Sequence, residues 1–195
     1  ASEIPKLQPP ANEIISFPKP HLEQQIQVFN GYEMVSAAAV VEGIAERRLP
    51  YVPLYRQADA RWGWKQYGTA NMADSGCAPT SLAMAISYYK GRNILPPETA
   101  KLALKEGWRV PHVGTSWEAM DEMPEMYGLT SERATWSEAK KALREGKLVI
   151  QSHHRGYFTS GGHVLLLTGV NRDGSYKVND SGPRHRSKAS ERQVK

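Results

Sequence analysis

The chain has 195 residues, 40% of them hydrophobic and 23% charged, a balance typical of a globular protein with a sizeable core. Its formal net charge is +5, but no basic patch is interleaved with aromatic residues, so we expect no nucleic-acid partner. The longest apolar run, residues 164–167, is too short for a transmembrane segment, and a single cysteine excludes an internal disulfide.

The first 49 residues differ in composition and hydrophobic pattern from the rest of the chain. Residues 1–30 hold five prolines and no lasting periodicity, which indicates an extended segment or linker. Residues 31–49 place apolar side chains at helical spacing, which predicts an amphipathic accessory helix. Whether residues 1–49 act as a pro-segment, a linker or a partner-binding arm is open at this point.

The central part of the chain reads as helical. Residues 51–55 predict a short strand at a sheet edge, because Pro53 cannot donate to a ladder. A turn-rich stretch then leads to Ser75, and residues 77–89 predict a helix that ends at Gly91. Further helices are predicted over residues 96–107, 115–128 and 136–146. Pro124 is expected to kink or end the helix over 115–128.

Strands follow the helices. Residues 147–152, 162–170 and 175–180 predict three strands, the last two joined as a hairpin through a turn at 171–174. Helices first and antiparallel strands second indicate the α+β class. Residues 184–195 form a basic tail, which we interpret as a solvated terminus.

Cys77 is the clearest candidate for a chemical role. A loop of small residues delivers it to the start of a predicted helix, where the helix dipole favours a thiolate over a thiol. A thiolate is the nucleophile in cysteine chemistry. The alternative is a small buried hydrophobe, the commonest role of a free cysteine.

The predicted hairpin supplies a partner for this thiol. His163 opens the most apolar strand after Gly161 and Gly162, and Asp180 ends the next strand. In an antiparallel hairpin the start of one strand lies beside the end of the other, so a base and an orienting group come level. Asn179 is the alternative orienting residue. The competing interpretations are a core histidine for His163 and a turn former for Asp180.

Other candidates are less specific. Gln57, preferred over Asn71, could donate a side-chain amide to an oxyanion. Trp62 and Trp117 could form walls of a substrate groove, or simply pack in the core, and Gly162 would let a substrate approach closely. No Cys/His spacing resembles a zinc site, so we expect no metal and no cofactor.

Six segments of the chain, taken together and in sequence order, resemble the papain-like cysteine peptidases related to the double-glycine leader peptidases of bacteriocin exporters. They span about residues 50–183. Two positions depart from the family pattern: Ala78 stands where glycine is usual, and Ser181 follows Asp180 where proline is usual. The segments are 55–63, 67–68, 75–84, 114–117, 161–170 and 178–180.

The resemblance implies a papain-like fold, with the nucleophile on a central helix packed against an antiparallel sheet. It implies Cys77 as nucleophile, His163 as general base, Asp180 as orienting residue and Gln57 as oxyanion donor. The expected activity is hydrolysis of a peptide-type bond in a leader peptide, another peptide or a peptidoglycan cross-link. The alternatives are a catalytically silent peptide- or wall-binding module and a transglutaminase-like acyl transferase.

The setting of the activity follows from the same resemblance. The related leader peptidases are fused to transporters, and this chain shows no transporter. We therefore expect a free-standing bacterial enzyme that is secreted or associated with the cell wall, with a cytoplasmic location as the alternative. The oligomeric state is open.

Overall fold

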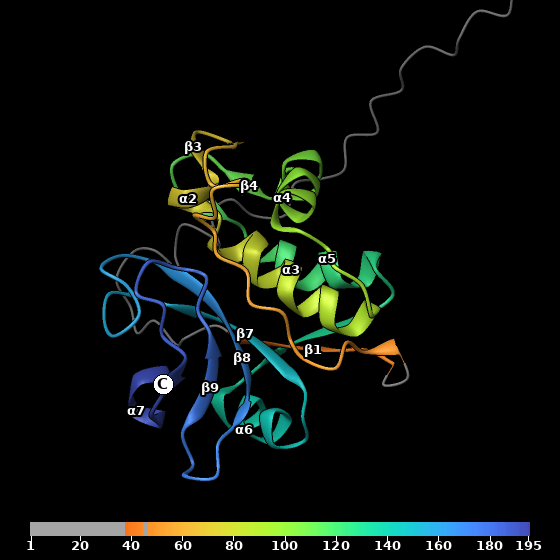
Figure 1. The fold of residues 1–195 in the computed structure, drawn as a ribbon, viewed down its shortest axis with the longest axis vertical. Helices are drawn as coiled ribbons and strands as arrows, with labels where there is room; N and C mark the ends of the chain where they lie inside the picture. The colour runs from red at the N-terminus through yellow and green to blue at the C-terminus, as the bar shows by residue number, and fades with distance from the viewer. Residues whose placement is uncertain (1–37, 45–46) are drawn as a thin grey trace, which may run out of the picture. The chain divides into compact units, whose positions relative to one another are not determined.

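The computed structural model describes residues 38–44 and 47–195, and within them six strands form one antiparallel sheet. The strand order is β10-β9-β8-β7-β1-β6 (Figure 1). Two small two-stranded sheets, β2 with β3 and β4 with β5, lie outside it. The strands are β1 (Ala38–Glu42), β2 (Gln66–Tyr67), β3 (Ala70–Asn71), β4 (Arg109–Val110), β5 (Gly114–Thr115), β6 (Thr130–Ala134), β7 (Leu148–His153), β8 (His163–Val170), β9 (Tyr176–Asn179) and β10 (Lys188–Ala189).

Helices cover both faces of the large sheet (Figure 1). Helices α3, α4 and α5 contribute to the hydrophobic core on one face, and α6 and α7 contribute to a second core on the other. This arrangement is a mixed α+β fold, as the sequence predicts. The helices are α2 (Met72–Ser75), α3 (Cys77–Lys90), α4 (Pro96–Lys105), α5 (Glu118–Met126), α6 (Trp136–Arg144) and α7 (Glu191–Val194).

The two cores explain why the central strands are apolar without interruption. Successive side chains of a strand point to opposite faces, and here both faces are covered. In β7, Leu148 and Ile150 pack in the core that contains α3, whereas Val149 packs in the core that contains α6. In β8, Leu166 belongs to the first core and Leu165 to the second.

Helix α3 is buried nearly all round, as expected for a helix that is apolar on every face. It begins at Cys77, where Gly76 provides no side-chain cap, and ends at Gly91, whose φ of 66° is left-handed. The backbone N–H of Gly91 bonds the Tyr88 carbonyl and closes the helix. The predicted helix over 77–89 is therefore confirmed, with the nucleophile candidate at its first position.

The predicted accessory helix over 31–49 is wrong for the stretch that forms β1 (Ala38–Glu42); residues 31–37, 45–46 and the proline-rich 1–30 lie outside the described residues. Strand β1 pairs with β6 on one side and β7 on the other. Its ladder partners are far away in sequence, so its local spacing of small and β-branched residues does not reveal them.

Two other predictions need correction. Residues 51–55 form no strand, and Asn179 and Met84 bond the backbone there, at the Pro53 carbonyl and the Tyr55 N–H. The basic tail over 184–195 is part of the fold, because it forms β10 and α7. Ala189 and Val194 are buried in the second core, and their apolar side chains hold the segment against the sheet.

We predict that Gly91→Ala destabilises the protein more than Gly146→Ala, which follows α6. Both glycines have left-handed φ values, 66° and 78°, so alanine costs about 1 kcal/mol at either position. A Cβ at Gly91 would also lie 2.0 Å from the Arg47 carbonyl oxygen, whereas a Cβ at Gly146 meets nothing within 4 Å. Urea unfolding of both variants measures the difference, and equal losses would contradict the prediction.

Candidate active site

The hairpin of β8 and β9 brings His163 and Asp180 into contact. The turn is closed by the Asn171 N–H, which bonds the Ser175 carbonyl at 2.7 Å, and the ladder ends at the pair Leu166↔Asn179. Asp180 follows directly. Its Oδ1 lies 2.7 Å from Nε2 of His163, and both residues are buried.

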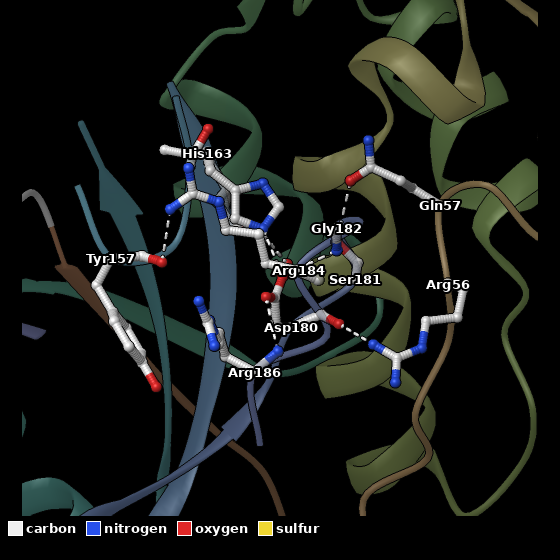
Figure 2. A network of polar contacts seen from close by, with 12 residues as sticks. Arg56, Gln57, Tyr157, His163, Asp180, Ser181, Gly182, Arg184 and Arg186 are labelled. Atoms are coloured by element: carbon white, nitrogen blue, oxygen red, sulfur yellow. Dashed lines mark hydrogen bonds and ion pairs between the residues drawn. The ribbon is translucent and has the colours of Figure 1, made fainter. Parts of the chain in front are cut away.

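The Asp180 carboxylate is held by three partners (Figure 2). Besides His163, the backbone N–H of Gly182 donates to Oδ1 at 2.8 Å and that of Arg186 donates to Oδ2 at 3.0 Å. Burial raises the pKa of Asp180, but these hydrogen bonds and the charge of His163 outweigh it and lower the pKa. Asn179 instead donates to the Pro53 carbonyl at 3.0 Å, so Asp180 is the residue that contacts the histidine.

Cys77 is the first residue of α3, and its thiol interacts with His163. Burial raises the pKa of the thiol, but the hydrogen bond and the charge of His163 act against it. Backbone hydrogen bonds from Val164 and Ala78 lower the pKa further, so that the net shift is downward. Because Nε2 of His163 is engaged by Asp180, Nδ1 is the ring nitrogen left for the thiol.

The same contacts act on the histidine in the opposite direction. Burial lowers the pKa of His163, but its hydrogen bonds with Asp180 and Cys77 and their negative charges raise the pKa to about 9. A cysteine with a lowered pKa beside a histidine with a raised pKa favours thiolate and imidazolium together at neutral pH. The arrangement can therefore supply a nucleophile and a proton donor at once.

Gln57 is buried, and its side-chain amide is oriented by two neighbours. Its Nε2 donates to the Ala73 carbonyl at 2.7 Å, and its Oε1 accepts a hydrogen bond from the Ser181 hydroxyl at 3.3 Å. A carbonyl oxygen can only accept, so the amide nitrogen must face Ala73. One of the two N–H bonds of Nε2 is then left for another acceptor.

The three predicted substrate-binding residues lie in different settings. Trp62 is only 2% exposed, and its indole N–H donates to the Arg56 carbonyl, so a substrate could reach little of this side chain. Trp117 is half-buried against the core that contains α3, and its Nε1 is buried without a hydrogen-bond partner in the described residues. Gly162 is exposed immediately before His163.

Sequence reasoning missed two residues that position this site. A Cβ at Gly182 would lie 2.8 Å from Cε1 and 2.9 Å from Nε2 of His163, so only glycine lets the chain pass this closely. Arg109 is buried and donates to the Tyr67 and Gly114 carbonyls and to the Ser75 hydroxyl, two residues before Cys77. Gly182 follows the departure from the family pattern at Ser181, but no local pattern indicates its contact with His163, and none indicates the role of Arg109.

The described residues present neither a metal-binding group nor a membrane-spanning helix. No group of three or more His, Cys, Asp and Glu side chains in residues 38–44 and 47–195 is arranged to hold a metal ion. No helix in this part of the chain has the length and apolar character that a bilayer crossing requires.

The Peptidase_C39 like family matches residues 50–194. The matched range includes Gln57, Cys77, His163 and Asp180, and it extends past residue 183 through β10 and α7. Comparisons with curated proteins and with solved structures found no match.

We predict that Gly182→Ala lowers the pKa of His163 from about 9 toward 6.5, its ordinary value, while the protein stays folded. The added methyl group would push the imidazole away from the carboxylate that favours its protonated form. NMR titration of the histidine rings measures the shift. Gly161→Ala is the matched control, because a Cβ there meets nothing within 4 Å. An unchanged His163 pKa in Gly182→Ala would contradict this account.

Proposed function

Because the chain belongs to the Peptidase_C39-like family, we propose that it is a cysteine peptidase that hydrolyses a peptide-type bond through Cys77, His163 and Asp180. The family match confirms the resemblance to papain-like cysteine peptidases that the sequence motifs indicate. The observation that carries the proposal is the 2.7 Å contact between Nε2 of His163 and Oδ1 of Asp180, with Cys77 close enough to His163 for each to shift the pKa of the other. A papain-like arrangement, with α3 as the central helix, is part of the proposal.

Acylation begins when the Cys77 thiolate attacks the substrate carbonyl carbon and the carbonyl π electrons move onto the oxygen. The tetrahedral intermediate collapses as the C–N bond breaks, and the His163 imidazolium gives its proton to the leaving amine. A thioester to Cys77 and a neutral imidazole remain. His163 then takes a proton from water as its oxygen adds to the thioester carbonyl. The C–S bond breaks, which releases the carboxylic acid and restores the thiolate and the imidazolium.

Asp180 acts on this cycle through His163. Its Oδ1 engages Nε2, so the imidazole keeps Nδ1 toward the thiol in both protonation states. The carboxylate also stabilises the imidazolium that must be present when the amine leaves. Because the lowered pKa of Asp180 keeps it ionised, this support persists across the neutral range.

The oxyanion is assigned to Gln57 and the start of α3. One donor is the N–H of Gln57 Nε2 that does not bond Ala73. The other donor is the backbone N–H of Cys77. Helix α3 adds the positive end of its dipole at the same place, since Gly76 leaves its first turn without a side-chain cap.

The substrate class proposed from the family is a peptide, with a leader peptide or a cell-wall peptide cross-link as particular cases. An intact Cys–His–Asp contact favours an enzyme over a silent binding module. Transfer of the acyl group to an amine would use the same residues. Incubating a cleaved peptide with a labelled primary amine distinguishes the two outcomes, because only a transferase incorporates the label.

We predict that iodoacetamide alkylates Cys77 well below pH 8.5, about the pKa of a free thiol, and that His163→Ala abolishes this acidic limb. The lowered pKa of Cys77 depends on His163, so the variant thiol should form a thiolate only at higher pH. Mass spectrometry from pH 4 to about pH 9 measures both rates. A thiol that behaves identically in the two proteins would sink the activated-pair mechanism.

The histidine sets the opposite limit for cleavage. Its folded-state pKa is raised to about 9, so the imidazolium that protonates the leaving amine is lost as the pH rises through that value. Peptide cleavage should therefore fall above about pH 9, whereas alkylation, which needs only the thiolate, should not.

We predict that Gln57→Ala reduces kcat for peptide cleavage by about 10²–10³-fold and leaves the alkylation rate of Cys77 unchanged. Alkylation proceeds without an oxyanion, so it is insensitive to an oxyanion donor. Steady-state kinetics and alkylation of the same preparations measure the two rates. Ser181→Ala is the control, because it removes the contact to Oε1 and keeps the N–H donor. Equal losses in both rates would instead indicate a general disturbance of the site.

A further inference from the structure

The two segments beside His163 carry several cations and no carboxylate apart from Asp180. Residues 151–163, which lead into β8, contain Arg155 but no Asp or Glu, and neither do residues 181–190. We call Arg155, Arg184 and Arg186 the cationic rim. Figure 2 shows Arg184 and Arg186 on the side of Asp180 opposite Arg56.

Arg184 joins the two segments. Its Nη1 donates to the Tyr157 carbonyl at 2.8 Å and also to the Gly156 carbonyl. Both contacts use the same nitrogen, so Nε and Nη2 have no hydrogen-bond partner in the described residues. Because Arg184 is also exposed, part of its guanidinium fork is available to a bound molecule.

Arg186 is held differently but has the same surplus of donors. Its guanidinium carbon lies 4.5 Å from the centre of the Tyr157 ring, a cation–π contact that holds the group beside the ring. Its Nε is buried without a hydrogen-bond partner in the described part of the chain. The backbone N–H of the same residue bonds Asp180, so this cation cannot drift far from the catalytic pair.

The rim has no counter-charge among residues 38–44 and 47–195, where Arg155, Arg184 and Arg186 form no ion pair. Other arginines of the domain do: Arg61 pairs with Asp59 and Arg133 with Asp121. An uncompensated group of planar donors beside a reactive centre is suited to a carboxylate.

The position of the rim indicates which part of a substrate it faces. His163 must lie next to the leaving amine in order to protonate it. Gly182 lies so near the His163 ring that a Cβ on it would clash with Cε1 and Nε2, and Arg184 follows two residues later. The rim therefore borders the leaving-group side of the scissile bond rather than the acyl side.

We propose that the cationic rim, with Arg184 as its principal donor, binds a carboxylate on the leaving-group side of the scissile bond. This inference rests on the proposed peptidase function and narrows its substrate class. The carboxylate is either an acidic side chain or the free C-terminus of a short leaving peptide, which present the same planar anion to the guanidinium.

A comparison of two alkylating reagents tests the rim without a substrate. Iodoacetate and iodoacetamide react with the same Cys77 sulfur, but only iodoacetate is anionic. We expect the iodoacetate rate divided by the iodoacetamide rate to fall by up to about fivefold in Arg184→Gln, because an exposed pair contributes up to about 1 kcal/mol. Arg184→Lys, which keeps the charge, should retain most of the ratio.

Arg172→Gln is the matched control for net charge. Arg172 is exposed in the turn between β8 and β9, at the end of the hairpin away from His163, and the substitution removes the same charge. A ratio that falls in Arg184→Gln but not in Arg172→Gln supports the rim. A ratio that is unchanged in Arg184→Gln, or that falls equally in both variants, overturns it.

Peptides used as protectants of Cys77 then distinguish the two carboxylate sources. Matched peptides with Glu or Gln after the scissile bond report an acidic side chain, and free-acid against amide C-termini report a terminal carboxylate. We expect one pair to differ with the wild type and to become equal with Arg184→Gln. Failure of the proposed peptidase function is a separate result, namely no cleavage of these peptides, and it leaves the reagent ratio measurable.

Discussion

The hydrogen bond between Nε2 of His163 and Oδ1 of Asp180 is the contact on which the site depends. It forms where the β8–β9 ladder ends, so the hairpin determines how these two side chains are placed relative to each other. Gly182 keeps a space in which the imidazole can lie, and two backbone N–H groups hold the carboxylate. Without this contact, burial alone would favour the neutral imidazole, which lacks the proton that the proposed mechanism gives to the leaving amine.

The position of Cys77 at the start of α3 complements that contact. The helix is buried on nearly every side, which fixes the position of its first residue, Cys77, relative to β8. Val164, in the same strand as His163, also bonds the sulfur, so strand and helix meet at the thiol. A helix and a strand therefore each supply one member of the proposed catalytic pair, and neither member depends on a loop for its position.

The parts of this arrangement that the sequence predicts are those encoded by local patterns. The helix from Cys77 to its glycine stop and the hairpin that joins His163 to Asp180 follow from periodicity and turn residues. Strand β1 was mistaken for a helix, because its partners at 130–134 and 148–151 lie far along the chain. The role of Gly182 depends on a contact with His163 that no local pattern encodes. The exposed, polar β6 gave no strand signal at all.

The insertion of β1 between β6 and β7 also has a consequence for the order in which the domain folds. During synthesis β1 leaves the ribosome before either neighbour exists, and it has no local partner to pair with. The ladder between β1 and β7 can form only after residue 151 has emerged, so β1 must pair with residues far along the chain. We infer that insertion of β1 is a slow, late step, and that chains arrested before it expose two unpaired strand edges that favour aggregation.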